Sequence, residues 1–261
     1  MLMLDTILYG DCRETLKTLT NSSVQMCVTS PPYYGLRDYG GEKNQIGLEQ
    51  TPEEYIDQLV QVFREVHRVL KDDGTLWVNI GDSYYNYRSG KGQALPKQTV
   101  SKTNQDLPQV NPKRGNKLDG LKEKDLIGIP WMLAFALRND GWYLRQDIIW
   151  HKPNPMPESV KDRCTKSHEY IFLLSKNKSY YYNHEAIKEP VKQDWGTRNR
   201  DNGKYHKAGT GLSPHTGLTK SYTTKNKRSV WGITNKPYKQ AHFATFPPDL
   251  ILPPILAGSR E

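Results

Sequence analysis

The stretch Val28-Thr29-Ser30-Pro31-Pro32-Tyr33 directly follows an apolar run that begins at Val24. The run predicts a short buried strand, and the two prolines must end it, because proline lacks a backbone N–H for the strand ladder and fixes φ. The residue before a proline is held extended. We therefore expect the Ser30 hydroxyl and the Pro31 carbonyl to face a common pocket, with the flat ring of Tyr33 at its rim. Two acceptor oxygens and an aromatic face suit a planar base that carries an exocyclic amine.

Helix and strand signals alternate along the chain, which predicts an α/β fold. Thr51-Pro52-Glu53-Glu54 is a strong helix start, since it offers an N-cap, a proline in the first turn and acidic residues near the positive end of the helix. Apolar residues then recur at helical spacing as far as Leu70, and a strand is expected over 75–80. This strand–helix–strand order predicts parallel pairing through a right-handed crossover. The other expected elements are a strand over 7–11, a short helix over 14–19, a helix over 126–137, a strand over 143–150 and a hairpin of 169–174 with 179–182.

The positive charge of the chain is concentrated after residue 80. Residues 1–80 hold 7 Lys and Arg against 12 Asp and Glu, whereas the remaining residues hold 30 against 16. Two stretches with little hydrophobic periodicity, 84–122 and 192–240, carry 8 and 11 of these basic residues, and aromatic residues are interleaved in the second. This composition suits contact with phosphates and bases and indicates a polyanionic partner. The alternative for each stretch is a solvated surface loop.

Composition also disfavours several classes of protein. The chain of 261 residues is long enough for one sizeable core, and it has neither an apolar run that could span a bilayer nor a signal-peptide pattern. Cys12, Cys27 and Cys164 show no metal-ligand spacing, and their odd number argues against a disulfide framework. We therefore expect a cytoplasmic protein with no membrane partner and no metal, in which Cys27 is a packing residue.

The order of the motifs resembles the permuted (beta-type) branch of the N4-cytosine and N6-adenine DNA amino-methyltransferase family. Besides residues 28–33, the resemblance rests on Gly10-Asp11-Cys12, Leu70-Lys71-Asp72-Asp73-Gly74, and residues 81–84, 149–154, 168–170 and 242–247. It implies a Rossmann-like methyltransferase sheet with long basic inserts. It also implies S-adenosylmethionine as the cofactor and double-stranded DNA as the substrate.

The resemblance further implies three groups of site residues. They are Ser30, Pro31, Pro32 and Tyr33 for catalysis; Asp11, Cys12, Phe243, Thr245 and Phe246 for the cofactor; and Lys152, Asn154, Lys225, Lys227 and Arg228 for DNA. Serine in the first motif position is typical of the branch that methylates N4 of cytosine. Methylation at N6 of adenine is the alternative, because adenine enzymes of the family more often carry Asp or Asn there.

The same resemblance divides the chain into regions. It implies a catalytic core over 1–191, which contains the basic insert 84–122. A target-recognition region is expected over 192–240. Residues 241–261 would return to the core with a helix on the cofactor side.

One feature of the family is not found in the sequence. In this branch, the segment that matches 242–257 is followed by a strand, a glycine-rich loop of the form Asp-Pro-Phe-x-Gly-x-Gly-Thr and an acidic residue, and no such run occurs here. We therefore expect a sheet that lacks its glycine-loop strand, in a truncated or split enzyme whose loop a second chain would supply. The alternatives are a non-catalytic DNA-binding fragment or subunit, and an RNA methyltransferase.

Overall fold

A computed structural model of the chain describes residues 5–36, 45–85, 118, 120–191, 223–236 and 245–260. The chain divides into two compact units. The larger comprises Met1–Tyr182 with Ser229–Glu261, and the smaller comprises Asn183–Arg228. No helix of the described segments is both long and apolar enough to cross a membrane.

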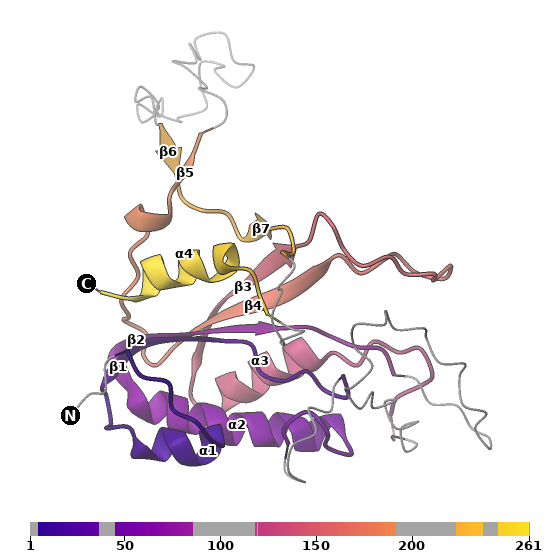
Figure 1. Ribbon diagram of the computed structural model, residues 1–261, viewed down its shortest axis with the longest axis horizontal. Helices are drawn as coiled ribbons and strands as arrows, with labels where there is room; N and C mark the ends of the chain where they lie inside the picture. The colour runs from indigo at the N-terminus through magenta and orange to yellow at the C-terminus, as the bar shows by residue number, and fades with distance from the viewer. Residues whose placement is uncertain are drawn as a thin grey trace, which may run out of the picture. The chain divides into compact units, whose positions relative to one another are not determined.

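The larger unit is built on a five-stranded sheet in the order β1-β2-β4-β3-β7 (Figure 1). The strands are β1 (Val24–Thr29), β2 (Leu70–Ile80), β3 (Tyr143–His151), β4 (His168–Ser175) and β7 (Val230–Gly232). Neighbours β1 and β2 are parallel, as are β3 and β7, whereas β4 is antiparallel to both β2 and β3. The carboxyl ends of four strands and the amino end of β4 therefore meet at one edge of the sheet, which we call the carboxyl edge.

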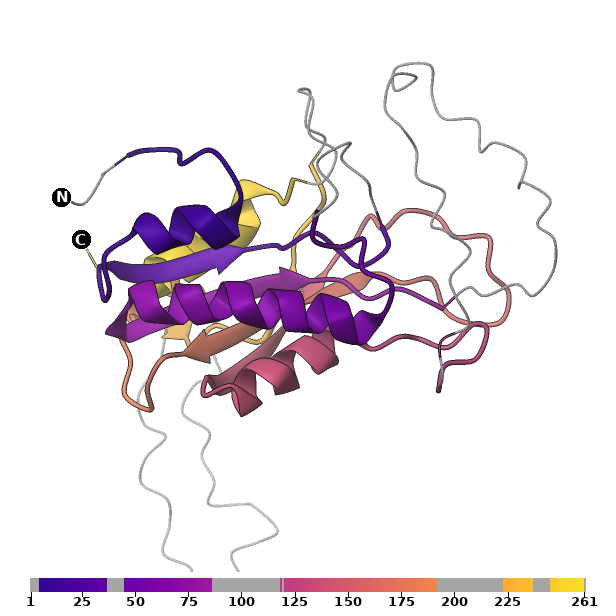
Figure 2. The same ribbon diagram turned by 90° about the horizontal axis from the view of Figure 1, so that it is seen from below.

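Helices cover both faces of this sheet (Figures 1 and 2). The helices α2 (Pro52–Val69) and α3 (Ile129–Asn139) lie on one face, and α4 (Pro248–Gly258) lies on the other. The side chains of β2 alternate accordingly. Leu76 and Val78 belong to the core beneath α2 and α3. Thr75 and Trp77 face α4 so closely that a Cβ at Gly258 would lie 2.9 Å from Thr75 Oγ1. The expected α/β fold is confirmed.

The helix α2 begins where local chemistry dictates. Thr51 and Glu54 form a reciprocal capping box and Pro52 opens the first turn, as the sequence predicts. The apolar stripe of α2 is buried in the core. The strand β2 starts earlier than expected, at Leu70 instead of Thr75. A register irregularity between the pairings of Val24 and Met26 accommodates the extra residues.

Three other expectations need correction. The helix α3 begins at Ile129 and not at 126, because the Asp82 carboxylate accepts hydrogen bonds from the backbone N–H groups of Gly128 and Ile129 and so fixes where the helix starts. Residues 7–11 form no strand. Residues 179–182 form no hairpin with β4, because both edges of β4 are already occupied by β2 and β3.

Two helical turns precede β1, close to the expected short helix. They are α1 (Cys12–Thr15) and the 3-10 helix Leu16–Thr18. Arg68 of α2 donates hydrogen bonds to the carbonyls of Leu16 and Leu19, so this segment is tied to α2.

The smaller unit contains a 3-10 helix, Glu185–Ile187, and an antiparallel pair of β5 (Glu189–Pro190) with β6 (Thr224–Lys225). Of the expected recognition region, residues 192–222 and 237–240 lie outside the described residues. The strand β7, which falls within that region, pairs with β3 and is part of the main sheet. Most of the expected insert 84–122 also lies outside the described residues.

Candidate active site at the carboxyl edge of the sheet

The Ser-Pro-Pro-Tyr loop (residues 30–33) leaves β1 at the carboxyl edge and is anchored by α2. The Tyr55 hydroxyl donates a 2.7 Å hydrogen bond to the Pro32 carbonyl. Tyr55 is fully buried, and this burial raises the pKa of its hydroxyl well above the ordinary value. The hydroxyl therefore stays protonated and remains a donor, which fixes the backbone of the loop.

Tyr33 is anchored at both its ring and its hydroxyl. A Cβ on Gly81 would lie 2.7 Å from Tyr33 Cε2, so the glycine at the end of β2 leaves the space that the ring occupies. The hydroxyl donates a 2.6 Å hydrogen bond to Glu169 Oε2, and Asn79 Oδ1 is a second acceptor at 3.3 Å. Burial and the nearby Glu169 carboxylate raise the pKa of Tyr33 well above its ordinary value, so this hydroxyl is protonated too.

Glu169 is the centre of a partly buried cluster. In addition to the hydrogen bond from the Tyr33 hydroxyl, Glu169 accepts a 3.1 Å hydrogen bond from Asn79 Nδ2. It also forms an ion pair with Lys152 Nζ. Lys152 also lies 4.3 Å from the centre of the Trp150 ring. Only 18% of the Lys152 side chain and 15% of the Glu169 side chain are exposed. The cluster therefore joins β2, β4 and the loop after β3 to the Ser-Pro-Pro-Tyr loop.

Asn154 joins the loop after β3 to one further loop at the same edge. Its side-chain oxygen accepts a 3.0 Å hydrogen bond from the backbone N–H of Asn235, and its side-chain nitrogen donates to the Asn235 carbonyl at 3.3 Å. Trp150 Nε1 adds a 2.8 Å bond to the Ile233 carbonyl. The loop after β3 is thus fixed to the loop after β7. Lys152 and Asn154, expected to contact DNA, lie at the same edge as the four expected catalytic residues.

Sequence reasoning missed Glu169, Asn79 and Gly81 as members of this site. Asn79 gave one usable signal, since an amide inside the apolar strand β2 needs a hydrogen-bonding partner when it is buried. Glu169 lies 136 residues from Tyr33 in the sequence, and only the pairing of the strands brings the two together.

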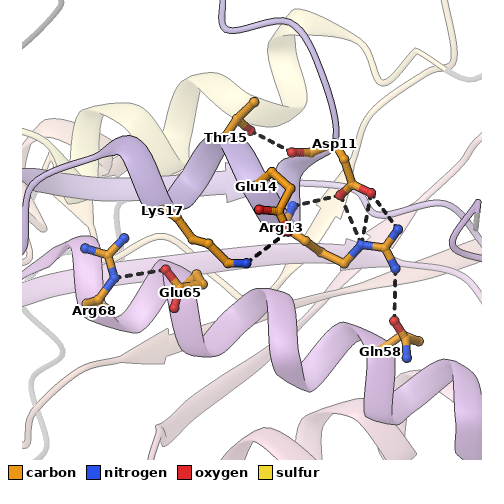
Figure 3. A network of polar contacts seen from close by, with 8 residues as sticks. All are labelled: Asp11, Arg13, Glu14, Thr15, Lys17, Gln58, Glu65 and Arg68. Atoms are coloured by element: carbon orange, nitrogen blue, oxygen red, sulfur yellow. Dashed lines mark hydrogen bonds and ion pairs between the residues drawn. The ribbon is translucent and has the colours of Figure 1, made fainter.

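Asp11 and Cys12, expected at the cofactor, lie at the start of α1. Figure 3 shows both carboxylate oxygens of Asp11 turned toward the guanidinium of Arg13. Hydrogen bonds from the side chain and backbone of Arg13 lower the pKa of Asp11. Arg13 also donates a 3.1 Å bond to Gln58 of α2, which holds this segment against the helix. The Asp11 side chain nevertheless remains 42% exposed.

The remaining expected site residues lie in three places. Thr245 is exposed and Phe246 is half-buried, just before α4, and Phe243 lies outside the described residues. Lys225 and Arg228 belong to the smaller unit, where both contact Glu189, with Nζ and Nε of the two basic side chains at 3.6 and 2.6 Å from Glu189 Oε1. Lys227 belongs to the same unit. The assignment of these residues to the cofactor and to DNA stays a prediction.

Comparison with known proteins agrees with the sequence motifs. The chain matches the family model for N6/N4 methyltransferases, described as DNA methylase, over residues 24–261. It is 46% identical over 255 residues to the type II methyltransferase M.Cfr9I of Citrobacter freundii, which covers 98% of this chain and 73% of the relative. It is 48% identical over 254 residues to the type II methyltransferase M.SmaI of Serratia marcescens, which covers 97% of this chain and 75% of the relative.

A solved structure shows the same fold. The PvuII DNA methyltransferase (cytosine-N4-specific) is similar with a TM-score of 0.57 and 16% sequence identity, over 96% of this chain and 69% of that one. At this identity the likeness concerns the fold alone. The match to the family model and the identity to the two relatives are much stronger, and they show that the chain belongs to the N6/N4 DNA methylase family.

Proposed function

We propose that the protein transfers a methyl group from S-adenosylmethionine to the exocyclic N4 amine of cytosine in duplex DNA. The observation that carries this proposal is the Ser-Pro-Pro-Tyr loop, which is fixed at the carboxyl edge by Tyr55 and Glu169 and has serine in its first position. Ligands of open α/β sheets bind at the carboxyl ends of the strands. Membership of a DNA methylase family supports DNA as the substrate.

The chemistry asks the loop to activate a poor nucleophile. The lone pair of the cytosine amine is conjugated with the ring and is therefore partly withdrawn from the nitrogen. Acceptor oxygens of Ser30 and Pro31 would take both amine hydrogens and favour a tetrahedral nitrogen. Positive charge develops on this nitrogen during methyl transfer, so the same acceptors bind the transition state better than the ground state. Holding the amine in line with the methyl donor supplies much of the remaining rate enhancement.

The target base must leave the duplex to reach this loop. Tyr33 is half-buried, and the flipped base would stack on the part of its ring that remains accessible. No covalent nucleophile is needed for transfer to an amine. Burial raises the pKa of the Cys27 thiol to about 11, so this cysteine remains protonated, in keeping with a packing role.

Asp11 and Phe246 would hold the cofactor, which supplies an electrophilic methyl group when it is bound. Two features of these residues support this assignment. Although Asp11 is bonded to Arg13, 42% of its side chain is exposed, so surface remains for the N–H or O–H donors of an adenosine group. The half-buried ring of Phe246 suits a sulfonium cation.

Nucleoside analysis tests the proposed product. The chain is expressed in bacteria that lack DNA methylation, both alone and as an extended chain. The extended chain carries at its carboxyl end a strand, a glycine-rich loop of the Asp-Pro-Phe-x-Gly-x-Gly-Thr type and the acidic residue that follows it in the family. Mass spectrometry of the digested DNA from cells with the extended chain should detect N4-methylcytosine. N6-methyladenine in its place would contradict the assignment of cytosine, and the absence of any methylated base from cells with folded extended chain would contradict the proposed activity.

We also propose that the smaller unit contacts DNA. Replacing Lys225, Lys227 and Arg228 together by alanine should flatten the slope of log affinity against log salt concentration by about 2–3 units, because each lost phosphate contact removes about 0.9. The slope is measured by titrating a duplex at several salt concentrations. A control variant in which Lys17, Lys71 and Lys178 are replaced by alanine should keep the slope of the unaltered chain. An unchanged slope in the first variant would assign the DNA-facing surface to other residues.

A further inference from the structure

The hydroxyl of Tyr33 is held by two neighbouring strands of the sheet. It donates a 2.6 Å hydrogen bond to Glu169 Oε2 on β4, and Asn79 Oδ1 on β2 is a second acceptor at 3.3 Å. The amide of Asn79 is fixed in turn, since its Nδ2 donates at 3.1 Å both to Glu169 Oε2 and to the Tyr170 carbonyl. Both acceptors belong to one hydrogen-bonded pair of strands, so they hold the hydroxyl in a fixed place.

The ring of Tyr33 is held from a second side by Gly81. A Cβ on Gly81 would lie 2.7 Å from Cε2 of the ring and 3.2 Å from Cδ2. The φ of Gly81 lies outside the left-handed region, so the ring, and not the backbone, requires glycine at this position. With its hydroxyl bound and one edge packed against the backbone, the ring has its orientation before any base arrives.

Lys152 balances the charge of the carboxylate that binds Tyr33. Its Nζ pairs with Glu169 Oε1, which leaves Oε2 for Tyr33 and Asn79. Only 15% of the Glu169 side chain is exposed, and a carboxylate so far removed from water needs a partner of this kind. The ammonium group also lies 4.3 Å from the centre of the buried Trp150 ring. The Lys152 cation is thus engaged by groups of the protein itself.

We propose that Glu169 and Lys152 are positioning residues, which hold the Tyr33 ring in the orientation on which the flipped target base stacks. The inference rests on the proposed function, in which the base stacks on this ring. It gives Lys152 a different role from the contact with DNA that the family resemblance implies. A ring that is fixed in the free protein has little freedom left to lose when the base binds. The base is therefore held more tightly, and its amine stays in line with the methyl donor.

Substitutions at the ion pair test this role, because the anchor of Tyr33 should work again when both charges are removed together. Lys152→Met keeps the apolar stem and leaves Glu169 as an unpaired carboxylate, which turns toward water and releases Tyr33. Glu169→Gln leaves Lys152 in need of an acceptor, so the amide oxygen faces Lys152 and the amide NH2 faces Tyr33. In the double variant the glutamine no longer serves Lys152, and its oxygen accepts the hydrogens of Tyr33 and Asn79 again.

The readout is the single-turnover rate of methyl transfer by the extended chain with saturating duplex and cofactor. Lys152→Met and Glu169→Gln should each lower the rate about fivefold or more, since the stacking of a base on an aromatic ring is worth this order. The double variant should recover most of the lost rate. Gly81→Ala should also lower the rate, because it displaces the ring without touching a charge. Lys176→Met is the matched control, since Lys176 is an ion-paired lysine at the opposite edge of the sheet with only 14% of its side chain exposed.

The salt dependence of duplex binding separates the anchoring role of Lys152 from a contact with phosphate. Lys152→Met should keep the slope of log affinity against log salt concentration, whereas the loss of a phosphate contact would flatten it by about 0.9. A slope flattened by this amount would overturn the inference, because it would assign Lys152 to a DNA phosphate.

Tyr33→Ala separates the two proposals. If Tyr33→Ala retains the rate of the unaltered chain, the base does not stack on this ring, and that part of the proposed function fails together with this inference. If Tyr33→Ala lowers the rate but the double variant remains as slow as Lys152→Met, the stacking contact stands and the role of the ion pair is overturned.

Discussion

Replacing Ser30 by alanine is expected to lower the rate of methyl transfer by about 10²–10³-fold, the loss seen when one preorganised hydrogen-bonding partner of a transition state is removed. The variant loses one of two acceptors for the amine hydrogens, and the developing charge on nitrogen is then less well stabilised. The fold should persist, because Ser30 lies beyond the end of β1 and is only half-buried. The rate is measured in a single turnover of the extended chain with saturating duplex and cofactor.

A matched control accompanies this measurement. Ser179 is exposed and lies outside the strands, so Ser179→Ala should keep the rate of the unaltered chain. Thermal unfolding of both variants should give midpoints within a few degrees of it. A Ser30→Ala variant that folds and retains a near-normal rate would show that the amine is bound elsewhere.

S-adenosylmethionine is expected to bind a polypeptide of these 261 residues about three powers of ten more weakly than it binds the extended chain. The strand β1 is the first strand in the sheet order, and all six of its residues are half-buried. A parallel strand added at its outer edge would deliver a glycine-rich loop to the carboxyl edge, beside the Ser-Pro-Pro-Tyr loop. Such a loop and the acid after it supply two or three hydrogen bonds to charged groups, each worth about 1.5–3 kcal/mol, which together amount to a factor of about 10³ or more.

Titration calorimetry measures this difference directly. S-adenosylmethionine should bind the extended chain and give little or no heat with the polypeptide of 261 residues. An extended chain whose loop glycines are replaced by valine is the control, since its backbone can no longer approach the ligand, and it should bind as weakly as the shorter polypeptide. Micromolar affinity in the shorter polypeptide would mean that residues 1–261 bind the cofactor without a glycine-rich loop, which contradicts the role given to that loop.

Local signals predicted the parts of the fold that local chemistry controls. The capping box of Thr51 and Glu54 gave the start of α2, and the proline pair gave the end of β1. The start of α3 could not be predicted in this way, because it depends on the carboxylate of Asp82, which lies more than forty residues earlier in the chain. A contact of this kind becomes visible only when the strand order is known.

The candidate site was predictable only where its residues are neighbours in the sequence. The Ser-Pro-Pro-Tyr loop is contiguous in the sequence, and its position after a strand placed it at the edge of the sheet. Its support is not contiguous, since Glu169, Asn79 and Lys152 come from three elements that the sheet brings together. The sequence indicated an aromatic ring for Tyr33 and gave no reason to expect that its hydroxyl would be bound by a carboxylate.

A structure of the extended chain with its duplex and a non-reactive analogue of S-adenosylmethionine would measure the decisive contact. The proposed function predicts that the target cytosine is flipped out of the duplex, with its exocyclic nitrogen at about 2.7–3.2 Å, the hydrogen-bonding distance, from both Ser30 Oγ and the Pro31 carbonyl oxygen. A target base that is flipped out but held through other residues, with Ser30 Oγ beyond hydrogen-bonding distance of the amine, would contradict it.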